Sequence, residues 1–189
     1  KSNPDFLMVG EGCYDLQSQY YGTYTRADYW HEPVLRYIDP TVPIACAVID
    51  HNDLNHVNMC LADRYAMSYE VRNFKGHLGE FPRVMAYGRK VDNLRRRYAD
   101  FLWNGEFLDV LGATVKGDNI RYTVFRNLKN GKKAVVVYNV DTKKANTASI
   151  SIDGSSAPLV MASPEKPAPA KFTGAVTLGP QSAVVIMEK

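Results

Sequence analysis

The spacing of hydrophobic residues divides the chain into two parts near residue 110. Before that point, short apolar runs alternate with segments in which apolar residues recur every three or four positions, a spacing typical of amphipathic helices. After it, apolar and polar residues alternate in short stretches separated by turn residues, which is typical of antiparallel strands. The pattern therefore predicts an α/β part over residues 1–110 and an all-β part over residues 111–189.

The first part is expected to contain two buried strands with helices between and after them. Short apolar runs at 6–12 and 43–49 predict the strands. Helical spacing is imperfect over 26–37 and 55–71 and is clearest over 81–103. In the last of these helices the apolar side chains form one stripe, whose members are Val84, Tyr87, Val91, Leu94, Tyr98 and Phe101.

The second part is expected to be an antiparallel β-sandwich. Asn130 and Gly131 predict a tight hairpin turn. Several short strands with regular turn signals favour two stacked antiparallel sheets. The predicted strands cover 120–125, 134–139, 147–152, 159–161, 175–178 and 183–187.

Acidic side chains follow both predicted strands of the first part. The first strand ends at Glu11, which lies between two glycines and is followed by Asp15. The second leads into Asp50, His51 and Asp53. A buried carboxylate without a partner is costly, so an acid at such a position is either paired or used. Parallel strands would bring these carboxylates to one edge, where acid/base chemistry is possible.

The order of these features resembles the carboxyl-terminal part of bacterial (β/α)₈-barrel glycoside hydrolases. The shared order is a strand ending in Glu11, an aromatic loop, a strand followed by Asp50-His51-Asn52-Asp53, a long amphipathic helix and an antiparallel sandwich. The segment 178–187 is similar to the last strand of the sandwich found in many such enzymes. The resemblance implies the last two β/α units of a TIM-type barrel at 1–110, followed by a sandwich at 111–189.

The resemblance also implies roles for individual residues. Counting back from the sandwich puts 6–12 at the seventh strand, which carries the nucleophile in retaining glycosidases with two catalytic glutamates. Glu11 then takes that position, and the acid/base of the fourth strand would lie outside this chain. The α-amylase-like enzymes offer another comparison, because a late strand in them ends in Asn-His-Asp. This chain has a related but reordered Asp50-His51-Asn52-Asp53.

The expected function is therefore hydrolysis of O-glycosidic bonds in a carbohydrate, with Glu11 and Asp50 as catalytic carboxylates. Aromatic rings stack on sugar rings and phenol hydroxyls bond sugar hydroxyls, whereas packing of a long loop explains the aromatic residues equally well. The residues expected to bind the substrate are Tyr14, Asp15, Tyr21, Trp30, His51 and Asp53. The alternative is a non-catalytic carbohydrate-binding or accessory module.

A complete barrel takes about 250 residues, and residues 1–110 are too few. The expected partner is the rest of the barrel in a longer polypeptide, or a second copy of this chain, because an open parallel sheet edge invites association. The amino terminus has neither an initiator methionine nor an apolar signal core, so it looks cut. The compartment stays open, and secretion or a periplasmic location of the parent protein is compatible with the chain.

Composition limits the other possibilities. A net charge of +3 is too small to imply nucleic-acid binding, and no apolar run reaches the roughly 18 residues of a membrane span. The three cysteines have no CxxC spacing and are expected to be buried thiols. The basic run 95–97 is expected on a solvated helical face.

A metal site is not expected. Asp50, His51, Asp53 and His56 are close in sequence, but their spacing matches no common ligand motif. No cofactor is expected either.

Overall fold

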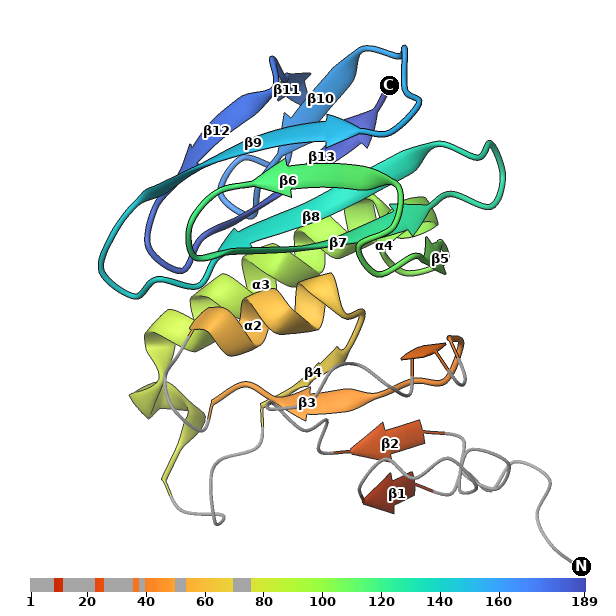
Figure 1. Ribbon diagram of the computed structural model, residues 1–189. Coiled ribbons are helices and arrows are strands. Elements are labelled where there is room, and N and C mark those ends of the chain that lie inside the picture. The colour runs from red at the N-terminus through yellow and green to blue at the C-terminus, as the bar shows by residue number, and fades with distance from the viewer. Residues whose placement is uncertain (1–8, 12–22, 26–35, 38–39, 50–53, 70–75) are drawn as a thin grey trace, which may run out of the picture.

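The computed structural model describes residues 9–11, 23–25, 36–37, 40–49, 54–69 and 76–189. Antiparallel sheet dominates its carboxyl-terminal part, whereas helices and short parallel strands make up the rest (Figure 1). No sheet within the described ranges closes into a barrel. No helix within them is long and apolar enough to cross a membrane.

Two antiparallel sheets form a sandwich-like arrangement. The larger has six strands in the order β11-β10-β13-β8-β7-β5, and the smaller has three in the order β12-β9-β6. The strands of the larger sheet are β5 (Glu106–Phe107), β7 (Ile120–Arg126), β8 (Lys133–Asn139), β10 (Leu159–Ala162), β11 (Ala170–Lys171) and β13 (Ala183–Glu188). Those of the smaller sheet are β6 (Ala113–Lys116), β9 (Asn146–Ile152) and β12 (Ala175–Leu178).

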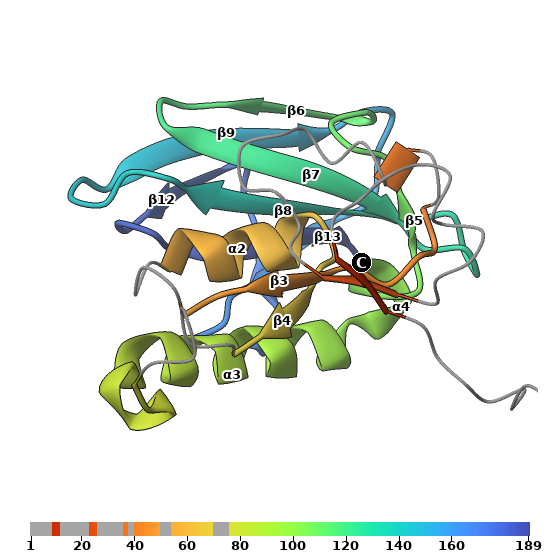
Figure 2. The same ribbon diagram turned by 90° about the horizontal axis from the view of Figure 1, so that it is seen from below.

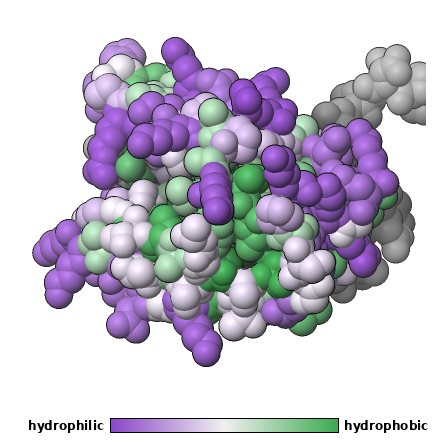
Figure 3. Space-filling view, turned by 90° about the horizontal axis from the view of Figure 1, so that it is seen from above, coloured by the Kyte–Doolittle hydropathy of each residue, from purple (hydrophilic) through white to green (hydrophobic). Residues whose placement is uncertain are grey.

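A hydrophobic core fills the space between these two sheets. Val135 and Val137 of β8 share it with Ile150 and Ile152 of β9. Strand β9 is buried at every second residue, since its other face looks outward. Seen from above, the molecule has hydrophilic side chains mainly around its rim and paler and hydrophobic ones toward its middle (Figure 3). The smaller sheet is thus the outer layer, which explains its alternating sequence.

Helices cover the other face of the six-stranded sheet. They are α2 (Leu54–Ala62), α3 (Pro82–Arg97) and the one-turn α4 (Ala99–Leu102), whereas the exposed 3₁₀ turn η3 (Leu78–Glu80) leads into α3. Figure 1 shows α2 and α3 lying between that sheet and the short strands β3 and β4, and in the view from below β3 and β4 appear between the two helices (Figure 2). Val136 and Tyr138 of β8 contribute to this second core, together with Val57 of α2 and Val91 of α3. Strand β8 is therefore buried on both faces, which accounts for its unbroken apolar run.

Buried polar contacts fix the helices on the sheet. The hydroxyl of Tyr87 in α3 donates to Asn58 Oδ1 in α2 at 2.7 Å. The Asn58 amide donates to the carbonyl oxygen of Gln181, just before β13, at 3.0 Å. Burial raises the pKa of Tyr87 well above its usual range.

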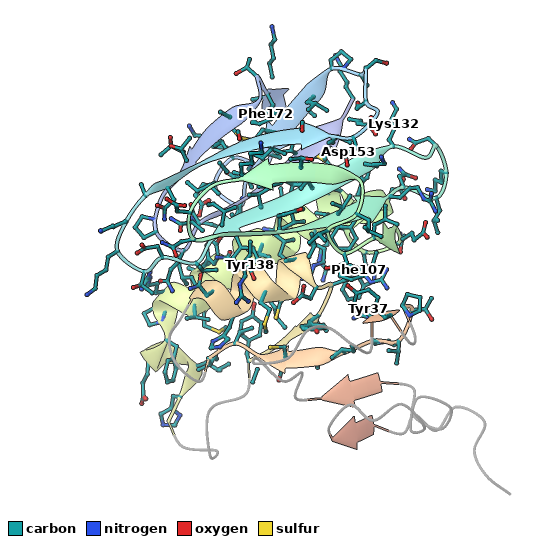
Figure 4. The ribbon with its side chains drawn as sticks, in the orientation of Figure 1. Tyr37, Phe107, Lys132, Tyr138, Asp153 and Phe172 are labelled. Atoms are coloured by element: carbon teal, nitrogen blue, oxygen red, sulfur yellow. The ribbon has the colours of Figure 1, made fainter. Side chains whose placement is uncertain are left out.

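An aromatic contact lies near β5, where the Phe107 ring meets the Tyr37 ring edge to face with centroids 6.3 Å apart (Figure 4).

Four short strands form two parallel pairs below the helices. Strand β1 (Val9–Glu11) pairs with β2 (Thr23–Thr25), and β3 (Ala45–Ala47) pairs with β4 (Ala66–Ser68). Helix α2 connects β3 to β4, so this segment is a βαβ unit. Strands β2 and β3 also contact each other, and the arrows of β1, β2 and β3 point to the same side in Figure 1.

Several elements expected from the sequence are confirmed. The predicted sandwich strands all occur with small shifts at their ends. A hairpin joins β7 to β8 as predicted, but its connection spans residues 127–132 and is wider than the tight turn expected, with Gly131 at φ 73°. The long helix is also confirmed, although it breaks at Tyr98 before α4. Two cysteines, Cys46 and Cys60, are free and buried, as expected, and Cys13 lies outside the described residues.

Other predictions were wrong. The helix expected over 55–71 ends at Ala62, and β4 follows it. Arg64 adopts φ 56° and the amide of Tyr65 donates to the carbonyl oxygen of Cys60 at 2.9 Å, which is a Schellman ending built without glycine. The sequence predicted β1 and β3 in the first part but missed β2 and β4. In the second part it missed β5, β6 and β11.

Candidate functional site

Glu11 is the last residue of β1. Its Cα lies opposite that of Thr25, the last residue of the parallel strand β2. Parallel strands end at the same edge of a sheet. Glu11 at the end of β1 and Thr25 at the end of β2 therefore lie at one edge. The structure describes the backbone of Glu11 and not its side chain.

Strand β3 leads the chain toward Asp50. The amide of Val48 donates to the carbonyl oxygen of Ser68 at 3.0 Å, which extends the pairing with β4 by one residue. Ile49 is then fully buried, and helix α2 begins at Leu54. Asp50 lies in the connection between them, beyond the carboxyl end of β3, and residues 50–53 are outside the described part of the chain.

The remaining predicted site residues also lie outside the described ranges. They are Tyr14, Asp15, Tyr21, Trp30, His51 and Asp53. Their roles stay predictions, as do those of Glu11 and Asp50. Within the described residues, no group of three or more His, Cys, Asp or Glu side chains could hold a metal ion.

One cavity of about 450 Å³ lies at the opposite end of the β3–β4 pair. Val42 and Pro43, which precede β3, line it together with Arg64, which precedes β4. Arg36 holds this end together, since its guanidinium donates to the carbonyl oxygens of Val42 at 2.6 Å and Arg64 at 2.8 Å. In parallel α/β architectures, sites form at the carboxyl ends of the strands. This cavity is therefore at the end that normally serves stability.

A larger cavity of about 640 Å³ runs beside β4. Met67 and Tyr69 line it from the strand side, and Met85 lines it from helix α3. Trp103, which follows α4 and is 41% exposed, contributes an aromatic surface.

Arginine side chains give this larger cavity its charge. Among the described lining residues, Arg89, Arg95 and Arg96 stand beside one acid, Asp92. Asp92 accepts a hydrogen bond from Arg96 Nε at 2.7 Å. Arginine has no neutral form at physiological pH, so the lining that the described residues contribute is net positive.

Arg95 is a structural residue of this cavity. Its guanidinium donates to the carbonyl oxygens of Tyr65 at 2.8 Å and Cys60 at 2.6 Å, and it lies 5.1 Å from the centroid of the Trp103 ring. Arg95 is only 4% exposed, and burial lowers its pKa. It thus caps the carboxyl end of α2 and ties that helix to α3.

The prediction of a solvated basic run was therefore wrong for Arg95. Arg96 and Arg97 are exposed, as expected. Arg95 follows Val91 by four positions and Tyr87 by eight, so the helical spacing already put it beside the buried stripe. The burial of Arg95 could have been predicted from its position in the helical period. Its place in a run of three arginines does not indicate whether it is buried.

Comparison with known proteins does not identify the chain. No model of a known protein family matches it, and no curated protein matches it in sequence. Its function must therefore be argued from its own residues.

Proposed function

We propose that this chain is the carboxyl-terminal part of a glycoside hydrolase, in which the end of a (β/α)₈ barrel is followed by a β-sandwich. It would act on O-glycosidic bonds of a carbohydrate through Glu11 and Asp50. The observation that carries the proposal is the shared direction of β1, β2 and β3. Because these strands run the same way, β1 ends at Glu11 and β3 ends shortly before Asp50 on the same side.

The strand spacing suits two cooperating carboxylates. Strand β2 pairs with β1 and contacts β3. Strand β2 therefore lies between the strand that ends at Glu11 and the strand that leads to Asp50, so both carboxylates would face one bound sugar. Retaining and inverting glycosidases use carboxylate separations of about 5 Å and about 6.5–9.5 Å.

The chemistry requires different protonation states for the two carboxyl groups. One must remain protonated to give a proton to the departing sugar oxygen, and the other must be ionised to attack the anomeric carbon or activate water. The tyrosines and tryptophan that follow β1 would stack on the sugar rings. His51 and Asp53 would bond sugar hydroxyls at the same edge.

Strand β4 changes the count along the proposed barrel. If α3 is the last barrel helix, β4 is the eighth strand and β3 the seventh, which moves Asp50-His51-Asn52-Asp53 to the seventh-strand position. Asp50 then becomes the candidate for the position first given to Glu11. Glu11, two strands away, becomes the candidate for the second carboxylate or for a ligand of a sugar hydroxyl.

The second candidate function is a non-catalytic carbohydrate-binding or accessory module. The extent of the antiparallel sandwich favours it, since most of the described strands belong to that part.

Incubation with oligosaccharides and polysaccharides separates the two functions. Release of reducing sugar by the parent polypeptide is expected for the hydrolase. Saturable sugar binding without any release, in both the parent polypeptide and this chain, would contradict the hydrolase and favour the accessory module. The same assay with the chain alone shows whether these residues suffice.

A further inference from the structure

Among the described residues, β4 is hydrogen-bonded to another strand along only one of its two edges. The amide of Ala66 donates to the carbonyl oxygen of Ile44 at 2.7 Å, and the carbonyl oxygen of Ser68 accepts from Val48 at 3.0 Å. Backbone groups in a parallel strand point to alternate sides. Ala66 and Ser68 therefore face β3, and the N–H and C=O of Met67 face the opposite edge, where no described strand pairs.

The larger cavity lies along this strand and not at one of its ends. Its apolar lining comes from Met67 on β4, Met85 on α3 and Trp103 after α4. A strand edge that no described strand pairs with, beside an apolar groove lined by a helix, is the arrangement that accepts an added strand. Main-chain hydrogen bonds would form along Met67, and alternate side chains of the added strand would enter the groove.

Charge decides which kind of strand fits. Arg89 and Arg96 are exposed on the rim, and Asp92 is already bonded to Arg96. Two copies of this chain paired edge to edge would bring arginines toward arginines, which is unfavourable. A strand with a carboxylate next to its apolar residues would instead complement this rim.

We propose that the groove between β4 and α3 receives a parallel, apolar strand carrying an acidic residue, supplied by the part of the glycoside hydrolase polypeptide that precedes Lys1. This inference rests on the proposed function, because a barrel closes when its last strand pairs with its first. Beyond the proposed function, the inference specifies where the barrel closes, which residue of β4 forms the pairing, and the charge of the incoming strand.

Hydrogen exchange at individual backbone amides, followed by NMR, tests the pairing. In this chain alone, the Met67 amide is expected to exchange rapidly while the Ser68 amide, which faces β3, is protected. In the parent polypeptide, Met67 protection is expected to rise at least about a hundredfold, since its amide becomes hydrogen-bonded and buried. Equal exchange of Met67 in both proteins, or a parent gene with no coding sequence before Lys1, would overturn the inference.

A charge reversal provides the matched comparison. Arg89→Glu changes a residue that lines the groove, whereas Lys90→Glu changes its exposed neighbour outside that lining. In the parent polypeptide, Arg89→Glu is expected to lower the unfolding temperature more than Lys90→Glu, and in this chain alone the two variants should behave alike. Equal effects in the parent would contradict the acidic partner.

The outcomes keep this inference separate from the proposed function. Sugar hydrolysis by a parent protein whose Met67 amide stays unprotected would overturn the strand pairing alone. Protection of Met67 in a parent protein without glycosidase activity would overturn the function alone. Protection of Met67 that appears in the isolated chain as its concentration rises would show pairing between two copies, and would contradict the proposed occupant.

Discussion

In the proposed glycoside hydrolase, replacing Glu11 with glutamine is expected to lower kcat by on the order of 10³-fold, because glutamine has nearly the same shape and neither carries a negative charge nor transfers a proton. The position of Glu11 at the end of β1 supports this expectation. Steady-state kinetics on the preferred glycoside measure the effect. A rise in KM with kcat unchanged would instead assign Glu11 to binding of a sugar hydroxyl.

Glu165→Gln is the matched control for this variant. Glu165 is an exposed carboxylate between β10 and β11, and its replacement should leave both kinetic constants unchanged. Urea unfolding of Glu11→Gln should give a midpoint close to that of the wild type, which shows that the fold is intact. Wild-type turnover by Glu11→Gln would remove Glu11 from the mechanism.

Phe125→Ala is expected to give the largest loss of stability, about 3–5 kcal/mol. Phe125 is fully buried in β7, on the face of the six-stranded sheet covered by the helices. Its ring meets that of Phe107 edge to face, with centroids 5.6 Å apart. Truncation would remove this contact and leave a cavity where the sheet meets the helices. Urea unfolding, with the slope held to the wild-type value, gives the change in free energy.

Leu128→Ala is the control for the core. Leu128 is 69% exposed in the hairpin between β7 and β8, so its truncation should change stability by no more than about 0.5 kcal/mol. A loss below about 1 kcal/mol for Phe125→Ala would mean that the helices do not rest on this face of the sheet. Loss of helix signal at lower urea than sheet signal would further show that the two layers unfold separately.

The sandwich was predictable because its local signals agree with its packing. Alternation in β9 follows from one buried and one exposed face, and Gly131 supplies the positive φ in the hairpin between β7 and β8. The short strands β5 and β11 are two residues each and carry no such pattern. Their pairing depends on neighbouring strands, which local sequence does not encode.

The boundary between α2 and β4 was not predictable for a specific reason. The helix ends at a left-handed residue that is arginine, whereas glycine is the usual signal. Bonds from other segments hold this ending in place. One of them is the hydrogen bond from Arg36 Nη2 to the carbonyl oxygen of Arg64 at 2.8 Å. Such long-range contacts can override local preference, so the apolar spacing after Ala62 was read as more helix.

For the candidate site, the sequence predicted the strands that precede its residues and not the arrangement of its side chains. The run into Glu11 and the run toward Asp50 do form parallel strands, β1 and β3. The distance between the two carboxylates depends on side-chain directions and on the connection between Ile49 and Leu54. No periodic pattern specifies either of these. The charged lining of the cavity beside β4 was missed because Arg95 was grouped with its sequence neighbours and not with the buried stripe of its helix.

The proposed pairing of Glu11 with Asp50 at one sugar is best checked by a crystal structure of the parent polypeptide soaked with an oligosaccharide. A glycosidic bond is expected to lie between the carboxylates of Glu11 and Asp50, with an aromatic ring from the segment after β1 stacked on a sugar. A Glu11 carboxylate paired with a basic side chain beneath the surface, and sugar bound only on the sandwich, would contradict it.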